Sequence, residues 1–252
     1  MRVTKRDGRT EELNVEKIHK VCTWACEDIN NVSVSSLEIK AQIQFYEDIK
    51  TSDIQETLIK SAADLITEDT PNYQYVAGRL VNYHLRKQVY NAFKPPRLYD
   101  HVKRIIDLGL YTKELLDWYS EEEFDYIDEN VLDHNRDFLV TYAGMEQFRG
   151  KYLIKNRSTG QIFETPQMAF ILIAMTLFHS YAKYTDPNTL QEQIRYKDLN
   201  RMEWLTDYYD AISTFDISLP TPIMAGVRTN EKQFSSCVLI ECDDSLDSIN
   251  AT

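Results

Sequence analysis

The chain has 252 residues, of which 43% are hydrophobic and 27% charged, as in an ordinary globular protein of one large or two smaller domains. Asp and Glu number 40 against 28 Lys and Arg, and the net charge of −12 excludes general binding to nucleic acid or to anionic membranes. A phosphate-bearing ligand must therefore meet a local cluster of cations. Only 7 residues are glycine, which disfavours a Gly-rich phosphate loop and favours helix.

Targeting signals and cysteine usage both indicate a cytoplasmic protein without membrane partners. The first residues are charged and polar, so we expect no signal peptide. The longest apolar run, residues 168–178, is too short to span a bilayer. Four cysteines in a chain of this length do not form the pattern of a secreted disulfide framework.

The first part of the chain predicts a β-hairpin followed by a small helical bundle. Residues 3–6 and 9–13 flank Asp7-Gly8, a dipeptide that is typical of a tight two-residue turn because both positions tolerate positive φ. Asn14 is a good N-cap for a helix that continues to Ile29. Three further helices are expected: one from Ser35 or Ser36 to Ile49, one capped by Thr51 or Ser52, and one over residues 71–93 before Pro95-Pro96 ends the bundle.

This hairpin is a candidate phosphate site. Lys5, Arg6 and Arg9 place three cations on one short ribbon, and the helix beginning at Asn14 offers free N–H groups, with Lys17 one turn in. The alternative is an ordinary solvated ribbon. A Walker-like stretch, residues 144–151, has the wrong spacing, and the five histidines lack metal-ligand spacing, so we predict no metal site.

The remainder of the chain is expected to be helical first and then to start a sheet. Helices are predicted over much of residues 97–150, over residues 166–181 and over residues 199–214, with a second hairpin formed by residues 152–154 and 161–163. The acidic stretch 121–129 is either a solvated face or a site for a metal or a basic partner. Residues 215–219 and 234–241 predict strands whose partners must come from elsewhere, and residues 243–252 predict a turn entering a helix.

The cysteines fall into two pairs. Cys22 and Cys26 lie on one helix face and are expected in the core. Cys237 and Cys242 are five apart in a predicted strand, which separates their Cα atoms by roughly 16 Å, whereas a disulfide needs about 4.4–6.8 Å. Redox chemistry at either thiol would need a partner from elsewhere, and the alternative is an inert buried cysteine.

Several segments together resemble the large subunit of class I ribonucleotide reductases, most closely the aerobic class Ia type. Residues 3–8, 14–18, 49–54 and 84–87 resemble its ATP-cone, while residues 218–224 and 235–240 resemble the opening strands of its ten-stranded α/β barrel. Residues 244–249 resemble the start of its specificity-effector site. The resemblance implies a mainly α fold with small β parts: an ATP-cone over 1–94, a helical region over 95–214, and the first strands of an incomplete barrel over 215–252.

The resemblance also implies site residues. An activity site for ATP or the inhibitor dATP, with Mg²⁺, is implied at Lys5, Glu11, Glu12, Leu13, Asn14, Val15, Glu16, Lys17, Thr51 and Lys87. Gln55 stands where the family often has a histidine. Thr221 and Ser236 match positions that hold the nucleoside diphosphate, Cys237 matches one of two redox thiols, and Asp244, Ser245 and Leu246 match residues that bind a dNTP specificity effector.

The implied function is the N-terminal part of the large subunit of a ribonucleoside-diphosphate reductase, an oxidoreductase that is inactive without further polypeptide. The thiyl-forming Cys, the catalytic Glu and the second redox Cys would come from a C-terminal remainder, in the same gene or in a separate chain. A small subunit would supply a di-iron radical cofactor, and thioredoxin or glutaredoxin would act indirectly. The alternative function is a non-catalytic, nucleotide-sensing regulatory protein whose only working part is the cone.

Overall fold

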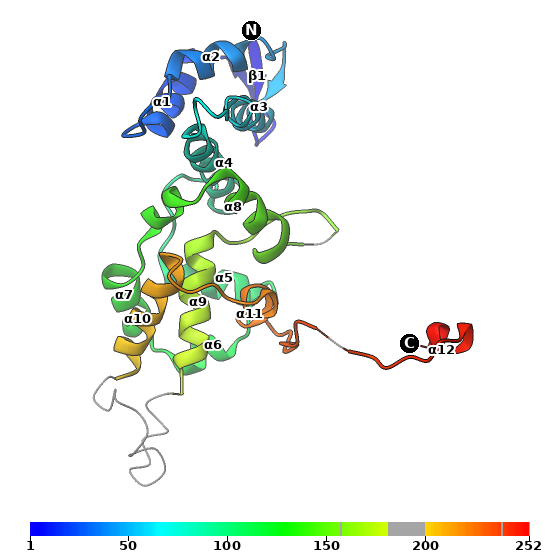
Figure 1. Ribbon diagram of the computed structural model, residues 1–252. Helices are drawn as coiled ribbons and strands as arrows, with labels where there is room; N and C mark the ends of the chain where they lie inside the picture. The colour runs from blue at the N-terminus through cyan, green and yellow to red at the C-terminus, as the bar shows by residue number, and fades with distance from the viewer. Residues whose placement is uncertain (157, 181–199, 238, 252) are drawn as a thin grey trace.

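The computed structural model describes residues 1–156, 158–180, 200–237 and 239–251, which form three successive parts. An N-terminal unit (residues 1–94) lies at one end, a helical body (residues 95–214) follows, and a C-terminal segment (residues 215–252) begins on the body and then leaves it (Figure 1). Helices dominate the N-terminal unit and the body, as the sequence predicted. Within the described residues, no helix combines the length and the apolar character that crossing a membrane requires.

A small sheet opens the N-terminal unit. Strand β1 (Arg2–Thr4) pairs antiparallel with β2 (Thr10–Glu12) and parallel with β3 (Ile49–Lys50). The hairpin was predicted, but its two-residue turn is wrong: Gly8 N donates to Lys5 O, Lys5 N donates to Arg9 O, and only Gly8 of the dipeptide has a positive φ (84°). This is a longer hairpin loop with a glycine bulge.

The third strand was missed. A helix was expected to run to Ile49, yet α2 (Val34–Gln42) ends before it, and Ile49 is buried against β1 instead. Asp48, with φ of 60°, turns the chain into this position and donates its N–H to Arg2 O. So short a strand is defined by a partner far away in the sequence, and its own residues carry no periodic signal.

The N-terminal unit has the four helices that the sequence predicted, but their caps and ends differ: α1 ends before Ile29 and α4 before Phe93. Asn14 caps α1 (Val15–Cys26), as predicted, by accepting from Lys17 N at 3.1 Å. Ser33, rather than Ser35 or Ser36, caps α2. Helix α3 (Thr51–Ala63) begins at Thr51 itself, with no side-chain cap from Thr51 or Ser52. Helix α4 (Tyr73–Tyr90) then ends shortly before Pro95-Pro96.

Helix α4 is shared between the N-terminal unit and the body. It packs on α1 and α3 on one side and on α8 (Tyr142–Gln147) and η1 (His134–Leu139) on the other. Gly78 permits this approach, because a Cβ there would lie 2.2 Å from Val140 O. The body is built from the following further elements: α5 (Leu98–Asp107), α6 (Glu114–Trp118), α7 (Glu121–Asn130), η2 (Phe148–Tyr152), α9 (Pro166–Phe178) and α10 (Arg201–Ser213).

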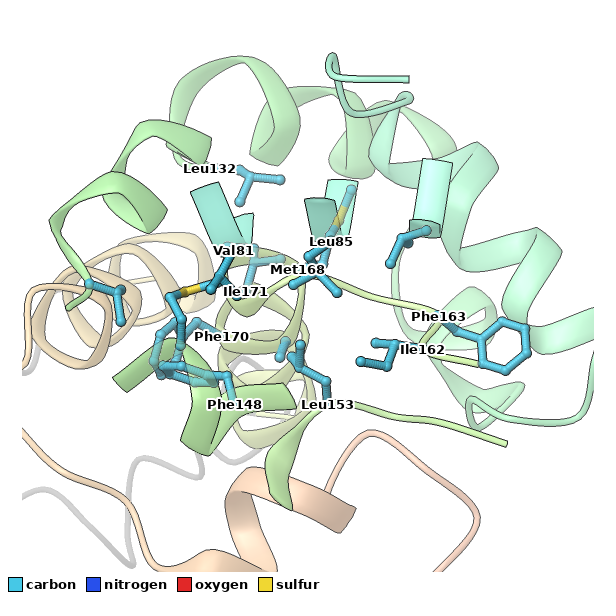
Figure 2. Close-up of a cluster of buried hydrophobic side chains, with 14 of the residues drawn as sticks. Val81, Leu85, Leu132, Phe148, Leu153, Ile162, Phe163, Met168, Phe170 and Ile171 are labelled. Atoms are coloured by element: carbon cyan, nitrogen blue, oxygen red, sulfur yellow. The ribbon is translucent and has the colours of Figure 1, made fainter. Parts of the chain in front are cut away.

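Helix α9 is the centre of the body. Its residues 166–176 are all buried, which confirms the prediction of a buried apolar helix. Tyr181, where this helix was expected to end, and Leu199, where the next helix was expected to begin, lie outside the described residues. Figure 2 shows Met168, Phe170 and Ile171 of α9 gathered with Val81 and Leu85 of α4. Burial of such side chains stabilises by roughly 1.5–3 kcal/mol each, which holds α4 and α9 in one core.

The acidic stretch 121–129 forms helix α7, whose first turn is capped by Ser120 in a capping box with Glu123. Its carboxylates take part in ion pairs, with Glu121 and Asp125 bonded to Arg97 and Glu123 to Arg201. No group of three metal-ligating side chains occurs here or elsewhere in the described residues. The stretch is therefore a helix face carrying ion pairs.

The remaining β predictions are largely wrong. The second hairpin is reduced to one bridge between Lys155 and Ile162, and in the C-terminal segment the described residues of 215–219 and 234–241 form no strand. Instead, α11 (Thr221–Gly226) and α12 (Leu246–Ala251) are short helices. Residues 230–237 and 239–251, the exposed arm, carry open apolar side chains such as Leu239, which is 98% exposed. A strand needs neighbours to pair its backbone, and the described chain brings none to the arm.

Candidate functional site

A cavity of about 420 Å³ lies in the N-terminal unit, between the hairpin, the first turns of α1 and α3, and the C-terminal half of α4. Most of the side chains implied for the activity site line it, namely Lys5, Glu11, Leu13, Asn14, Lys17, Thr51 and Lys87. Glu12, Val15 and Glu16 do not. Residues from four separate elements thus converge on one cavity, which we call the N-terminal cavity.

Further residues that were not predicted as site residues also line the cavity. They are Val3, Arg6, Asp7, Ile18, Val21, Ile54, Gln55, Tyr83 and Asn91. Arg6 had been noted as one of the ribbon's cations and Gln55 as a departure from the family. Helical spacing could have found Tyr83, which precedes Lys87 by one turn on the same face of α4.

The charges of the cavity are only partly compensated. Glu11 lies 3.0 Å from Lys5 Nζ and 3.8 Å from Lys17 Nζ, and the hydrogen bond from Lys5 lowers the pKa of Glu11. Asp7 pairs with Arg9 at 2.6 Å, and this contact lowers the pKa of Asp7. The two acidic side chains of the cavity wall are therefore already engaged.

Two cations of the wall have no such partner. Within the described residues, neither Arg6 nor Lys87 makes an ion pair with a carboxylate. Loss of hydration lowers the pKa of Arg6, and the Lys87 ammonium lies 5.8 Å from the centre of the Tyr83 ring. In a chain with a net charge of −12, unpaired cations facing a cavity favour an anionic ligand.

The first turn of α1 adds donors. Asn14 occupies the N-cap with its side chain bonded to Lys17 N, which leaves the N–H groups of the preceding helical residues without an intrahelical partner. The positive end of the helix dipole adds to the attraction for phosphate. Val15 and Glu16 can therefore contribute backbone donors although their side chains do not line the cavity.

Part of the cavity lining is apolar. Val3, Ile18 and Ile54 are buried there beside Val21 and Tyr83. Gln55 is the polar exception, because its Oε1 is buried and has no hydrogen-bond partner among the described residues. A cavity lined by cations, by apolar side chains and by one open amide matches the chemistry of a nucleotide.

His84 lies behind this wall on α4. Burial lowers the pKa of His84 to about 4, against the opposing effect of Glu56, whose Oε1 lies 3.3 Å from His84 Nε2. Glu56 also pairs with Arg149 of the body at 3.1 Å. At neutral pH His84 is uncharged, so it adds no cation to the cavity.

The side chains implied for substrate and effector binding are not brought together. Thr221 opens α11 on the body, whereas Ser236 and Cys237 lie on the exposed arm (Figure 1). Asp244, Ser245 and Leu246 lie at the start of α12 and are exposed. Among the described residues no hydrogen bond joins Thr221 to Ser236 or Cys237.

The two cysteine pairs differ in environment. Cys22 and Cys26 are core residues, as predicted, and burial raises their pKa values to about 12 and about 11. Cys237 and Cys242 are exposed free thiols, so the alternative of a buried inert cysteine at position 237 is wrong.

Two families match the chain, and together they define its class. Residues 1–88 match the ATP cone domain, and residues 138–232 match the all-alpha domain of ribonucleotide reductase. The first match contains the N-terminal cavity, and the second contains α9, α10 and α11. The chain therefore combines an ATP cone, which implies binding of a nucleotide effector, with a match to the all-alpha domain of ribonucleotide reductases.

Curated relatives place the chain more narrowly. It is 55% identical over 250 residues to the ribonucleoside-diphosphate reductase subunit alpha of Haemophilus influenzae and 54% identical to the ribonucleoside-diphosphate reductase 1 subunit alpha of Escherichia coli. It is 42% identical to the subunit alpha of Enterobacteria phage T4. These matches cover 98–99% of this chain and 30–31% of each relative. The chain thus corresponds to the N-terminal third of alpha subunits.

Proposed function

We propose that this chain is the N-terminal part of a class Ia-type ribonucleoside-diphosphate reductase alpha subunit and that its N-terminal cavity is the activity site for ATP or dATP. The observation that supports this most directly is the pair of uncompensated cations, Arg6 and Lys87, which line the same cavity as Asn14 and Lys17 at the start of α1. The triphosphate would lie against these donors, and the base would lie on the apolar wall formed by Val3, Ile18 and Tyr83.

Mg²⁺ fits this proposal only as a companion of the nucleotide. The described residues contain no group of three metal-ligating side chains, so the phosphates would supply most of the ligands. The other residues implied for the site, Glu11, Asn14, Lys17 and Thr51, line the cavity and would contact the nucleotide directly. Glu12, Val15 and Glu16 would act through the backbone or through their neighbours.

Cys237 would take part in the reduction itself. Its thiol and a second thiol from further polypeptide would be oxidised to a disulfide, while the ribose 2′ carbon is reduced and the 2′-hydroxyl leaves as water. Thr221 and Ser236 would hold the nucleoside diphosphate, and Asp244, Ser245 and Leu246 would contact a dNTP specificity effector. The exposure of Cys237 supports this, because a redox thiol must be accessible.

The proposed partners follow from the same relatives. The family implies a larger alpha chain and a small subunit that carries a radical cofactor. We propose that the cofactor is a di-iron centre, that thioredoxin or glutaredoxin re-reduces the disulfide indirectly, and that the complex works in the cytoplasm on nucleoside diphosphates.

Calorimetric titration of the chain with ATP tests the cavity. We expect saturable binding that weakens with added salt, and binding of adenosine that is weaker because it lacks the phosphates. Failure of ATP to bind at any concentration tested would contradict the assignment.

The second candidate function is a nucleotide sensor without catalysis. It is favoured by one observation: the N-terminal cavity is assembled among the described residues, whereas Thr221 and Cys237 are not brought together. Purification from the native source, followed by mass spectrometry of associated chains, separates the two. A self-sufficient monomer that binds ATP supports the sensor, and an associated polypeptide that restores turnover supports the reductase.

A further inference from the structure

A buried polar cluster joins α4 to the first turn of α9 in the body. Helix α4 contributes Tyr83 and Lys87 to the lining of the N-terminal cavity. Asp137 of η1 is fully buried, and its Oδ1 accepts from the backbone N–H of Gln167 at 3.1 Å. Its Oδ2 lies 3.7 Å from Nη2 of Arg86, which is also buried on α4. The cluster therefore links a helix of the N-terminal unit to the central helix of the body.

Direct contacts continue from Arg86 to the cavity. The Arg86 guanidinium lies 5.2 Å from the centre of the Phe93 ring and 4.8 Å from that of Phe138. Phe93 in turn packs against Tyr83, with ring centres 5.4 Å apart, and Tyr83 is a wall of the cavity. Tyr83 also lies under the Lys87 ammonium, which faces the proposed phosphates.

The Arg86–Asp137 contact is incomplete. At 3.7 Å it is too long for a hydrogen bond, and Arg86 Nε, Asp137 Oδ2 and Gln167 Nε2 have no hydrogen-bond partner among the described residues. Arg86 Nη2 already donates to the backbone carbonyl of His134. Buried polar groups without partners are costly, so a displacement of about 1 Å that brings the Arg86 guanidinium onto Asp137 Oδ2 would satisfy groups that now have none. Burial raises the pKa of Asp137 to about 7, against the opposing effect of Arg86.

A second buried pair in the body shows the contrasting, closed arrangement. Glu164 and Arg228 are both fully buried and directly bonded, and Glu164 also accepts from Tyr111 Oη and from Ile154 N. Arg228 donates further to two backbone carbonyls. Neither side chain of this pair has a buried polar atom without a hydrogen-bond partner, so a small displacement would gain nothing. The pair is therefore a suitable internal reference.

We propose that Arg86 and Asp137 are positioning residues that couple nucleotide occupancy of the N-terminal cavity to the first turn of α9. The inference rests on the proposed function of the cavity. A bound triphosphate would attract the Lys87 ammonium away from the Tyr83 ring. This movement would reach Arg86 because Tyr83 contacts Phe93 and Phe93 contacts Arg86. The distance between Arg86 and Asp137 then changes, and the strength of the hydrogen bond that Gln167 N–H donates to Asp137 changes with it.

Hydrogen exchange of the wild-type chain, with and without ATP, tests the coupling without any substitution. We expect ATP to change the protection of the Gln167 amide by about fivefold or more, the low end of ordinary allosteric coupling. The Ile154 amide, which donates to Glu164 in the reference pair, should keep its protection. Equal protection of Gln167 in both states would overturn the proposal, provided that calorimetry shows ATP bound.

Substitution tests the same coupling from the other side, since linkage is reciprocal. We expect Asp137→Asn to change the Kd for ATP by about fivefold or more, whereas Glu164→Gln should leave it unchanged. An unaltered Kd in Asp137→Asn would overturn the proposal. If that variant does not fold, the exchange experiment decides alone. Absence of ATP binding in the wild type would instead remove the proposed function, and this inference with it.

Discussion

The N-terminal unit and the exposed arm both carry candidate binding residues; in the first most of them line one cavity, whereas the described candidate residues of the arm are exposed. In the N-terminal unit, a hairpin, a capped helix and the end of α4 bring Lys5, Lys17 and Lys87 to one place. In the arm, Ser236 and Cys237 lie in open chain with no packed neighbour among the described residues. The difference teaches that the elements which form the first site all lie within the N-terminal unit, whereas the described residues bring no strand partner to the arm.

Removing the proposed redox thiol tests the arm most severely. In the assembled reductase, we expect Cys237→Ser to lower turnover with a dithiol reductant by roughly 10³-fold or more, because a group essential to the chemistry is lost. ATP binding should persist, since the cavity lies elsewhere. Cys242→Ser, at the other exposed thiol, is the matched control and should keep turnover. Multiple turnover by Cys237→Ser would refute the assigned role.

Removing an uncompensated cation tests the cavity. We expect Arg6→Ala to weaken ATP binding by roughly 10–100-fold, because a hydrogen bond to a charged group contributes about 1.5–3 kcal/mol. Arg9→Ala is the matched control: Arg9 lies on the same ribbon but pairs with Asp7 and does not line the cavity. Calorimetry should show a near-normal Kd for that variant. Equal losses in both variants would mean that only the overall charge of the ribbon matters.

The junction between the N-terminal unit and the body can be broken at Gly78. Gly78→Ala places a Cβ 2.2 Å from Val140 O, and such overpacking costs about 1–3 kcal/mol, which exceeds the gain of up to about 1 kcal/mol in helix propensity. We expect a lower urea midpoint. Gly150→Ala, where a Cβ meets open space, should not destabilise. A stable Gly78→Ala variant would show that α4 can move away from residues 140–142.

The smallest effect is expected at a helix cap. Asn14→Ala and Ser33→Ala each remove an N-cap bond and should each lower the free energy of unfolding by about 1 kcal/mol. Only Asn14 lines the cavity, so only Asn14→Ala should also weaken ATP binding. Urea unfolding and calorimetry on the same samples check both expectations. Equal ATP affinity in the two variants would limit Asn14 to a structural role.

Much of the N-terminal site was readable from local patterns. Asn14 as a cap and Pro95-Pro96 as a helix end are local signals, and the cations of the hairpin stand out in an acidic chain. Ile49 as a strand residue was not readable, because it is defined by its pairing with Val3, more than forty positions away. The arm was misjudged for a related reason: alternation predicts a strand only where a partner is present.

The sequence by itself determined the helical character, the capped start of α1, the buried α9 and the gathering of cations on the hairpin, because helix periodicity, capping and charge act over a few residues. Only the tertiary structure decided which cations stay unpaired, because it places Glu11 beside Lys5 and Asp7 beside Arg9. It alone decided that Arg86, near the C-terminal end of α4, lies beside Asp137. These two residues are distant along the chain, and no local pattern encodes their contact.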